Sequence, residues 1–130
     1  MLTVLVLLIS QGGCTAQKIN GKATNAQEEE ALIVYIRLSD EKSGKPDERE
    51  KLFKLEDQLL SAIEKSGAGQ YDGNEIGEGF FTLYMYGPSA ARLWEAASPI
   101  VKASRAPSGS YVIKRYGRPG AKQDRISLSE

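Results

Sequence analysis

The chain has 130 residues, with 17 Lys or Arg and 17 Asp or Glu, so its formal net charge is zero. This length predicts one domain, and 41% hydrophobic with 26% charged residues is typical of a soluble globular chain. The absence of histidine excludes serine–histidine triads and most zinc sites, and a single cysteine excludes an internal disulfide. A net charge of zero gives no electrostatic basis for binding duplex nucleic acid.

The N-terminal segment has the pattern of a signal for export. Residues 1–17 carry no charge, and the apolar run 2–9 is followed by Gly12-Gly13-Cys14. The run is shorter than the roughly 20 apolar residues of a membrane-spanning helix, but it fits the hydrophobic region of a secretory signal. Small residues before a lone cysteine resemble the lipobox of bacterial lipoproteins, and this resemblance implies lipidation of Cys14. Gln11 departs from that motif, and no basic residue precedes the run.

Two alternatives for this segment remain, namely secretion without a lipid and a β-strand at residues 3–10 with a buried Cys14. Residues 15–29 contain one aliphatic side chain, Ile19, too few for a packed core. We therefore expect a signal-like segment at 1–14, a flexible tether at 15–30 and a folded domain at 31–130. The expected location is the bacterial cell envelope, lipid-anchored or periplasmic, with the lipid as the sole membrane contact. A strand at 3–10 would instead indicate the cytoplasm.

The folded part predicts strands and helices in the order β-α-β-β-α-β. Alternating β-branched and aromatic residues predict strands, and apolar residues at helical spacing predict helices. The predicted elements are a strand at 31–38, a helix from the cap Asp47 to Gly67, strands at 70–76 and 80–86, a helix at 90–103 that kinks or restarts at Pro99, a strand at 110–116, and a weak edge strand at 125–128.

This order predicts an α+β fold of the ferredoxin-like type. Two right-handed crossovers place both helices on one face of a four-stranded antiparallel sheet. Several short segments within residues 31–128 also resemble a group of small bacterial proteins of unassigned function that are predicted to be ferredoxin-like. These segments are Leu55-Glu56-Asp57, Tyr71-Asp72-Gly73-Asn74-Glu75, Leu83-Tyr84-Met85-Tyr86-Gly87-Pro88, Gly109-Ser110-Tyr111-Val112 and Arg115-Tyr116-Gly117. The resemblance implies the fold and no activity.

The uncovered sheet face is the predicted binding site. If the aliphatic side of strand 31–38 faces the helices, aromatic side chains and one cation point away from them. The strand at 110–116 adds one of two sets of side chains to this face. The set is either Val112, Lys114 and Tyr116 or Tyr111, Ile113 and Arg115. Exposed apolar patches usually mark a partner or ligand site. We therefore expect a protein partner or a second copy of the chain to bind Tyr35, Arg37, Phe80, Tyr84 and Tyr86, unless a terminal tail covers them.

Other chemistries have weaker support in the sequence, and we expect no enzyme, cofactor or metal site. The acidic stretch 72–78 fails the EF-hand pattern, although Asp72 and Glu75 leave an enzyme with a carboxylate pair as an alternative. Val34-Tyr35-Ile36 resembles the short motif of RNA-recognition domains, which stack bases on sheet aromatics. Glu78 and Thr82 depart from the longer motif of that family. We therefore expect no nucleic acid partner.

Overall fold

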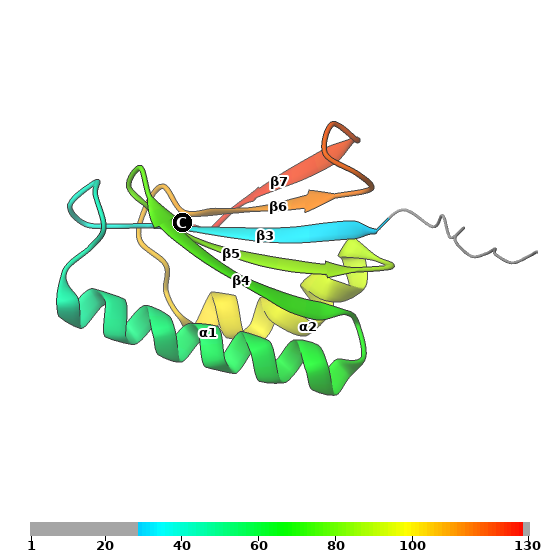
Figure 1. Cartoon of the computed structure of the whole chain (residues 1–130), viewed down its shortest axis with the longest axis horizontal. Coiled ribbons are helices and arrows are strands. Elements are labelled where there is room, and N and C mark those ends of the chain that lie inside the picture. The colour runs from blue at the N-terminus through cyan, green and yellow to red at the C-terminus, as the bar shows by residue number, and fades with distance from the viewer. Residues whose placement is uncertain (1–28, 129–130) are drawn as a thin grey trace, which may run out of the picture.

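The computed structural model describes residues 29–128 (Figure 1). The predicted signal-like segment, the alternative strand at 3–10, Cys14 and nearly all of the predicted tether lie outside the described residues. The elements are β3 (Glu30–Arg37), α1 (Pro46–Ser66), β4 (Gln70–Gly77), β5 (Phe80–Gly87), α2 (Ala90–Ala103), β6 (Tyr111–Arg115) and β7 (Gln123–Ser127). Within this range, no helix is long and apolar enough to cross a membrane.

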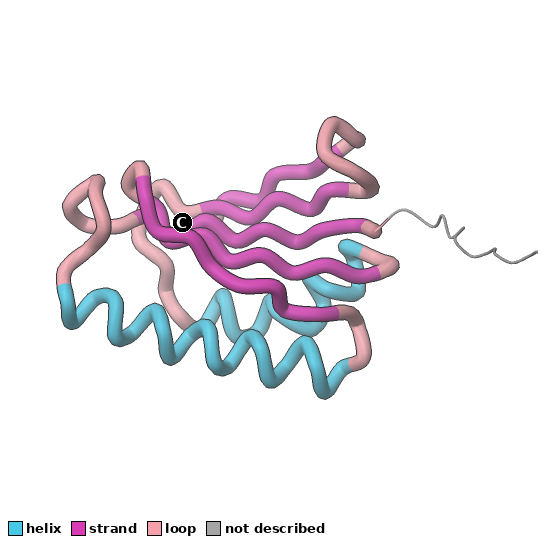
Figure 2. The backbone as a smooth tube through the Cα atoms, in the orientation of Figure 1, coloured by secondary structure: helices cyan, strands magenta, loops and turns pink. Residues whose placement is uncertain are grey.

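The fold is α+β, with two helices and an antiparallel sheet of five strands in the order β4-β5-β3-β6-β7. Both helices lie on the same side of the sheet, which leaves the other side open (Figures 1 and 2). The prediction of four strands was therefore wrong. The fifth strand is the weak pattern near the C-terminus, where β7 pairs along the whole of β6, from Tyr111↔Ser127 to Arg115↔Gln123.

The main core lies between the sheet and the two helices. Leu32, Val34 and Ile36 of β3 are buried there, as the alternation predicts. On α1, the buried side chains recur at helical spacing, which places one stripe of the helix against the sheet. That stripe consists of Leu52, Leu55, Leu59 and Ile63.

Helix α1 begins earlier than predicted. Lys45 rather than Asp47 is the N-cap, Pro46 is the first helical residue, and Glu48 completes the capping box. The Glu48 carboxylate accepts hydrogen bonds from the backbone N–H of Lys45 at 3.1 Å and of Ser39 at 3.0 Å. Proline favours the first position of a helix, because its fixed φ suits the helix and its missing N–H would have no partner there.

Helix α2 runs without interruption from Ala90 to Ala103, with Pro99 inside it. Of the two outcomes predicted at Pro99, a kink or a restart, the restart is therefore wrong. Ser89 caps the helix, since its hydroxyl accepts a hydrogen bond from the backbone N–H of Arg92 at 3.2 Å. Pro99 is exposed, so water can reach the backbone groups that its ring leaves without a helical hydrogen bond.

Candidate functional site

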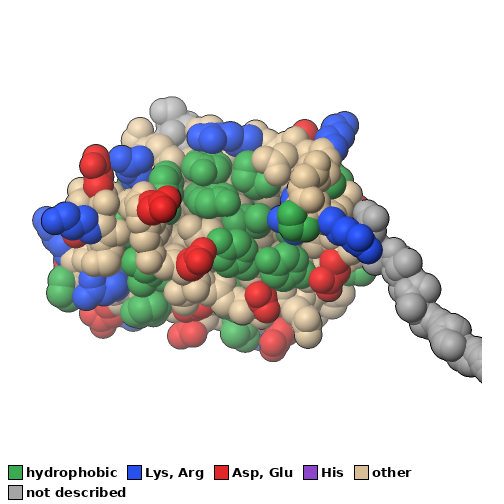
Figure 3. All heavy atoms as spheres, turned by 45° about the horizontal axis from the view of Figure 1, so that its top comes forward, with side chains coloured by type: hydrophobic (Ala, Val, Ile, Leu, Met, Phe, Trp, Pro, Cys, Tyr) green, Lys and Arg blue, Asp and Glu red, His purple; other side chains and the backbone are tan. Residues whose placement is uncertain are grey.

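The open face of the sheet carries the predicted site residues. The register pairs Arg37 with Phe80, Tyr35 with Thr82, and Ile33 with Tyr84 across β3 and β5. Their neighbours in sequence, such as Val34 and Leu83, are in the main core on the opposite face. The predicted facing is therefore confirmed for Tyr35, Arg37, Phe80, Tyr84 and Tyr86. Figure 3 looks onto this face and shows hydrophobic side chains gathered in its middle.

Strand β6 adds the second of its two possible sets of side chains to this face. Val112 belongs to the main core, whereas Ile113 lies opposite Ile33 and Tyr111 opposite Tyr35. Neither set is purely apolar, so the sequence alone left both open. The register with β3 decides in favour of Tyr111, Ile113 and Arg115.

Three rings form an aromatic cluster at one end of the open face. Tyr35 stacks on Tyr111 with ring centroids 4.5 Å apart. Phe80 meets both rings edge-on, at 5.9 Å from Tyr35 and 5.8 Å from Tyr111. Stacked and edge-to-face pairs are favoured geometries for aromatic rings. We call Tyr35, Phe80 and Tyr111 the aromatic cluster. Tyr111 was not among the predicted binding residues.

Two arginines border the aromatic cluster from opposite sides. The guanidinium carbon of Arg37 lies 5.3 Å from the centre of the Phe80 ring, and that of Arg125 lies 3.6 Å from the centre of the Tyr111 ring. Both distances are within the range of cation–π attraction. Sequence reasoning missed Arg125, because the weak alternation of β7 gives no sign that this strand lies beside Tyr111.

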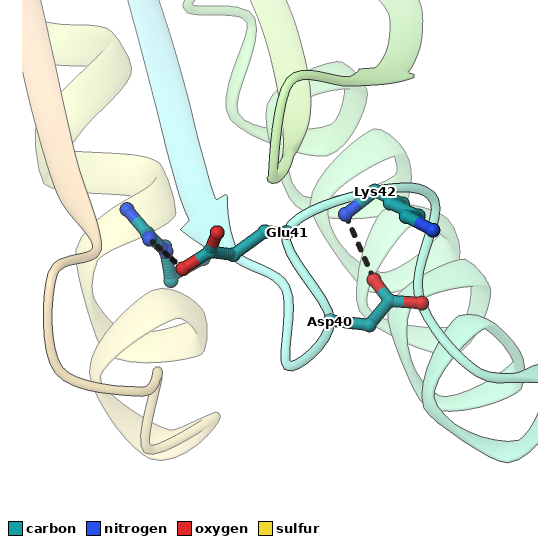
Figure 4. A network of polar contacts seen from close by, with 4 residues as sticks. Asp40, Glu41 and Lys42 are labelled. Carbon is teal, nitrogen blue, oxygen red and sulfur yellow. Dashed lines mark hydrogen bonds and ion pairs between the residues drawn. The ribbon is translucent and has the colours of Figure 1, made fainter.

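The loop after β3 positions Arg37. The Glu41 carboxylate lies 3.3 Å from the Arg37 guanidinium. The adjacent Asp40 carboxylate accepts a hydrogen bond from the backbone N–H of Lys42 at 2.9 Å (Figure 4), and a second from the backbone N–H of Gly44 at 2.9 Å. The bond from Lys42 is the main reason that the pKa of Asp40 lies below its ordinary value. Hydrogen bonds within the loop thus hold its acidic side chains at this end of the sheet.

The open face is covered in part by its own tyrosines. Ala31, Ile33 and Ile113 form a second, small core on this side, with exposed fractions of 0–7%. Tyr84 and Tyr86 pack against it together with two members of the aromatic cluster, and all these tyrosines are half-buried. The patch is therefore less bare than the sequence predicted. Its aliphatic floor is shielded, and the tyrosines form the accessible layer.

A hollow of about 400 Å³ lies between β4 and the aromatic cluster. Glu75 of β4 lines it, and its carboxylate accepts a hydrogen bond from the Tyr84 hydroxyl at 2.7 Å. This bond, with partial burial, raises the pKa of Tyr84 above its ordinary value. Thr82 also lines the hollow and is only 6% exposed. Among residues 29–128, its hydroxyl has no hydrogen-bond partner.

Charge is divided between the two sides of the open face. Glu75 and Glu78 line the hollow on the β4 side. Arg115 and Arg125 lie on the β6–β7 side, since the register places them opposite Ala31 and Ile113. In the described part of the chain, the one ion pair is that of Arg37 with Glu41. Figure 3 shows acidic side chains on one side of the hydrophobic middle and a row of basic ones on the other.

The two carboxylates of the alternative acid–base pair, Asp72 and Glu75, do not line the same hollow. Glu75 lines the hollow, but Asp72, at the irregularity of register between Tyr71 and Gly73, does not. No group of three or more potential metal ligands occurs between residues 29 and 128.

Comparisons of the chain with protein-family models, with curated proteins and with solved structures find no match.

Proposed function

We propose that this protein is a non-enzymatic, exported binding module that contacts another protein through the open face of its sheet. We further propose that its domain is a ferredoxin-like sandwich with one added edge strand. Among residues 29–128, the first four strands in chain order, β3, β4, β5 and β6, stand in the sheet order β4-β5-β3-β6, and two helices connect them on one face. This is the arrangement of that fold, with β7 paired at the outer edge of β6.

The observation that carries the binding role is the composition and arrangement of the open face. Five aromatic side chains, Tyr35, Phe80, Tyr84, Tyr86 and Tyr111, lie on one face of three adjacent strands. Aromatic residues and arginine are the residue types most enriched at the energetic centres of protein interfaces. The rings project from β-strands, whose backbone is already ordered. The surface therefore loses little conformational freedom on binding.

The chemistry of the face supports binding rather than catalysis. A catalytic carboxylate needs a substrate group within reach and a pKa suited to proton transfer. The Glu75 carboxylate accepts a hydrogen bond from the Tyr84 hydroxyl, and the chain has no histidine to act as a base. The available side chains are those of a contact surface.

The proposed location is the bacterial cell envelope, with Cys14 lipidated, and one substitution tests it. Cys14→Ser removes the only thiol of the chain. The variant is expected to move from the membrane fraction to the soluble fraction, because a single protein–lipid linkage would be lost. Fractionation followed by mass spectrometry of the mature N-terminus is the measurement. A soluble wild-type protein that still begins at Met1 would contradict both lipidation and export.

Site-specific photocrosslinking tests the binding surface itself. A photoreactive phenylalanine analogue placed at Tyr86, on the open face, is expected to form covalent adducts with one identifiable protein in cells that make the whole chain. The matched control position is Phe53 on α1, an aromatic side chain that is 44% exposed and lies on the helical side. Adducts at both positions alike, adducts with nucleic acid, or no adduct at Tyr86 would contradict the proposal.

A further inference from the structure

The open face carries a hollow with acidic side chains on its β4 side and arginines on its β6–β7 side. We propose that the protein bound there is a second copy of this chain, related to the first by a two-fold axis that runs parallel to β3. This inference rests on the proposed function, since it names the partner of the same face.

Symmetry limits how two copies can stack these faces. A closed pair of identical faces requires a two-fold axis in the plane between them. Because β3 is the central strand of five, an axis along it gives the largest overlap. A rotation about that axis keeps the position of each residue along the strand direction. It reverses the order of the strands across the sheet of the partner. Strand β4 then lies over the partner's β7, and β5 lies over the partner's β6.

The residues that meet follow from the cross-strand register. One row across the open face runs Glu75, Thr82, Tyr35, Tyr111, Ser127, and the next runs Gly73, Tyr84, Ile33, Ile113, Arg125. The partner's Arg125 therefore lies over Gly73, one row from Glu75. Rows on one face are two residues apart, about 6.8 Å along a strand, a span that an arginine side chain can bridge.

The position opposite Arg125 has room for this contact. Gly73 has no side chain, and a Cβ built on it would have no atom within 4 Å. Arg125 touches the Tyr111 ring, but no acidic side chain pairs with it in the described residues. Two equivalent contacts between Arg125 and Glu75 would therefore join the copies. An axis across the strands would instead lay the acidic β4 side over the partner's acidic β4 side, and like charges facing each other oppose association.

The hollow matches the same arrangement. Tyr111 and Thr82 are in the same row, on the strands to either side of β3. The rotation therefore places the partner's Tyr111 over Thr82, where the hollow of about 400 Å³ is open. A buried hydroxyl that forms no hydrogen bond lowers stability. The hydroxyl of the partner's Tyr111 would supply a polar group to the hollow that Thr82 lines. Each copy fills the other's hollow once, so that two equivalent contacts lie on either side of the axis.

Exchanging the charges tests the axis. Arg125→Glu and Glu75→Arg, each made in the whole chain with Cys14→Ser, are each expected to weaken self-association at least tenfold, because like charges then meet at both contacts. An equimolar mixture of the two variants is expected to restore association to near the wild-type level, since opposite charges again meet in the mixed pair. Sedimentation velocity gives the dissociation constants.

Two further variants keep this test decisive. Arg92→Glu makes the same charge change on the exposed side of α2 and should leave self-association unchanged. If Glu75→Arg does not fold once its bond to Tyr84 is lost, Glu75→Gln replaces it, because the amide oxygen can still accept that hydrogen bond while the charge that meets Arg125 is removed, and self-association should again weaken. A dimeric wild type whose mixed variants associate no better than each alone would overturn the axis and leave the proposed function intact. A wild type that stays monomeric while position 86 crosslinks to a different protein would overturn the second copy as partner. No protein adduct at position 86 would overturn the proposed function as well.

Discussion

Replacing Leu59 by alanine is expected to lower the free energy of unfolding by about 2–5 kcal/mol, the usual cost of truncating a fully buried leucine. Leu59 lies in the middle of α1 and is 0% exposed, within the core that joins the helices to the sheet. Truncation removes its apolar surface from that core and leaves a cavity that the neighbouring side chains fill only in part. Equilibrium unfolding in urea, followed by circular dichroism, measures the change.

The adjacent residue supplies the control. Leu60 is 38% exposed on the same helix, so Leu60→Ala is the same chemical change outside the core. It is expected to cost less than about 1 kcal/mol, since less apolar surface returns to water. Equal effects at the two positions, or a loss below about 0.5 kcal/mol for Leu59→Ala, would mean that the helix faces the sheet in a different register.

The double substitution Tyr84→Ala with Tyr86→Ala is expected to abolish self-association at concentrations where the wild type is dimeric. These side chains form much of the accessible layer between β5 and the partner's β6, and large aromatic anchors carry a disproportionate share of interface energy. In the proposed dimer, Tyr84 lies over the partner's Ile113, and Tyr86 lies over the partner's Arg115.

The same substitution is expected to lower the melting temperature without unfolding the domain. The two tyrosines cover Ile33 and Ile113 in the small second core, so some buried apolar surface becomes exposed. The main core on the other side of the sheet is not touched. Phe53→Ala, which truncates an exposed ring on α1, is the matched control and should leave association unchanged. A double variant that is unfolded by circular dichroism would assign these tyrosines to the fold rather than to an interface.

The parts of the fold that sequence predicted are those in which one residue pattern decides the structure. In β3 and β5, the alternation of side chains determined which residues face the helices, and the confirmed facing of Tyr35 and Phe80 follows from it. The spacing of Leu52, Leu55 and Leu59 likewise determined the buried stripe of α1. Local periodicity is a strong signal where one face is buried and the other is not.

The features that sequence missed depend on contacts between distant segments. Tyr111 could not be assigned to a face until β6 was paired with β3, and Arg125 joins the site only because β7 pairs with β6. Gly87 is a similar case. A Cβ there would lie 2.2 Å from the backbone oxygen of Ala68, a close approach between two chain segments. The sequence shows only a glycine at the end of a strand.

Sedimentation velocity of the wild-type sequence and of the Tyr84→Ala/Tyr86→Ala variant, over a range of concentrations, measures whether two copies associate through their open faces. Both whole chains carry Cys14→Ser, so that the lipid is absent and the N-terminal apolar run is common to the two samples. If two copies stack through their open faces, the wild type sediments as a dimer that dissociates on dilution, and the variant sediments as a monomer throughout. A wild type that remains monomeric at the highest concentration, or a variant that dimerises as strongly as the wild type, would contradict this account.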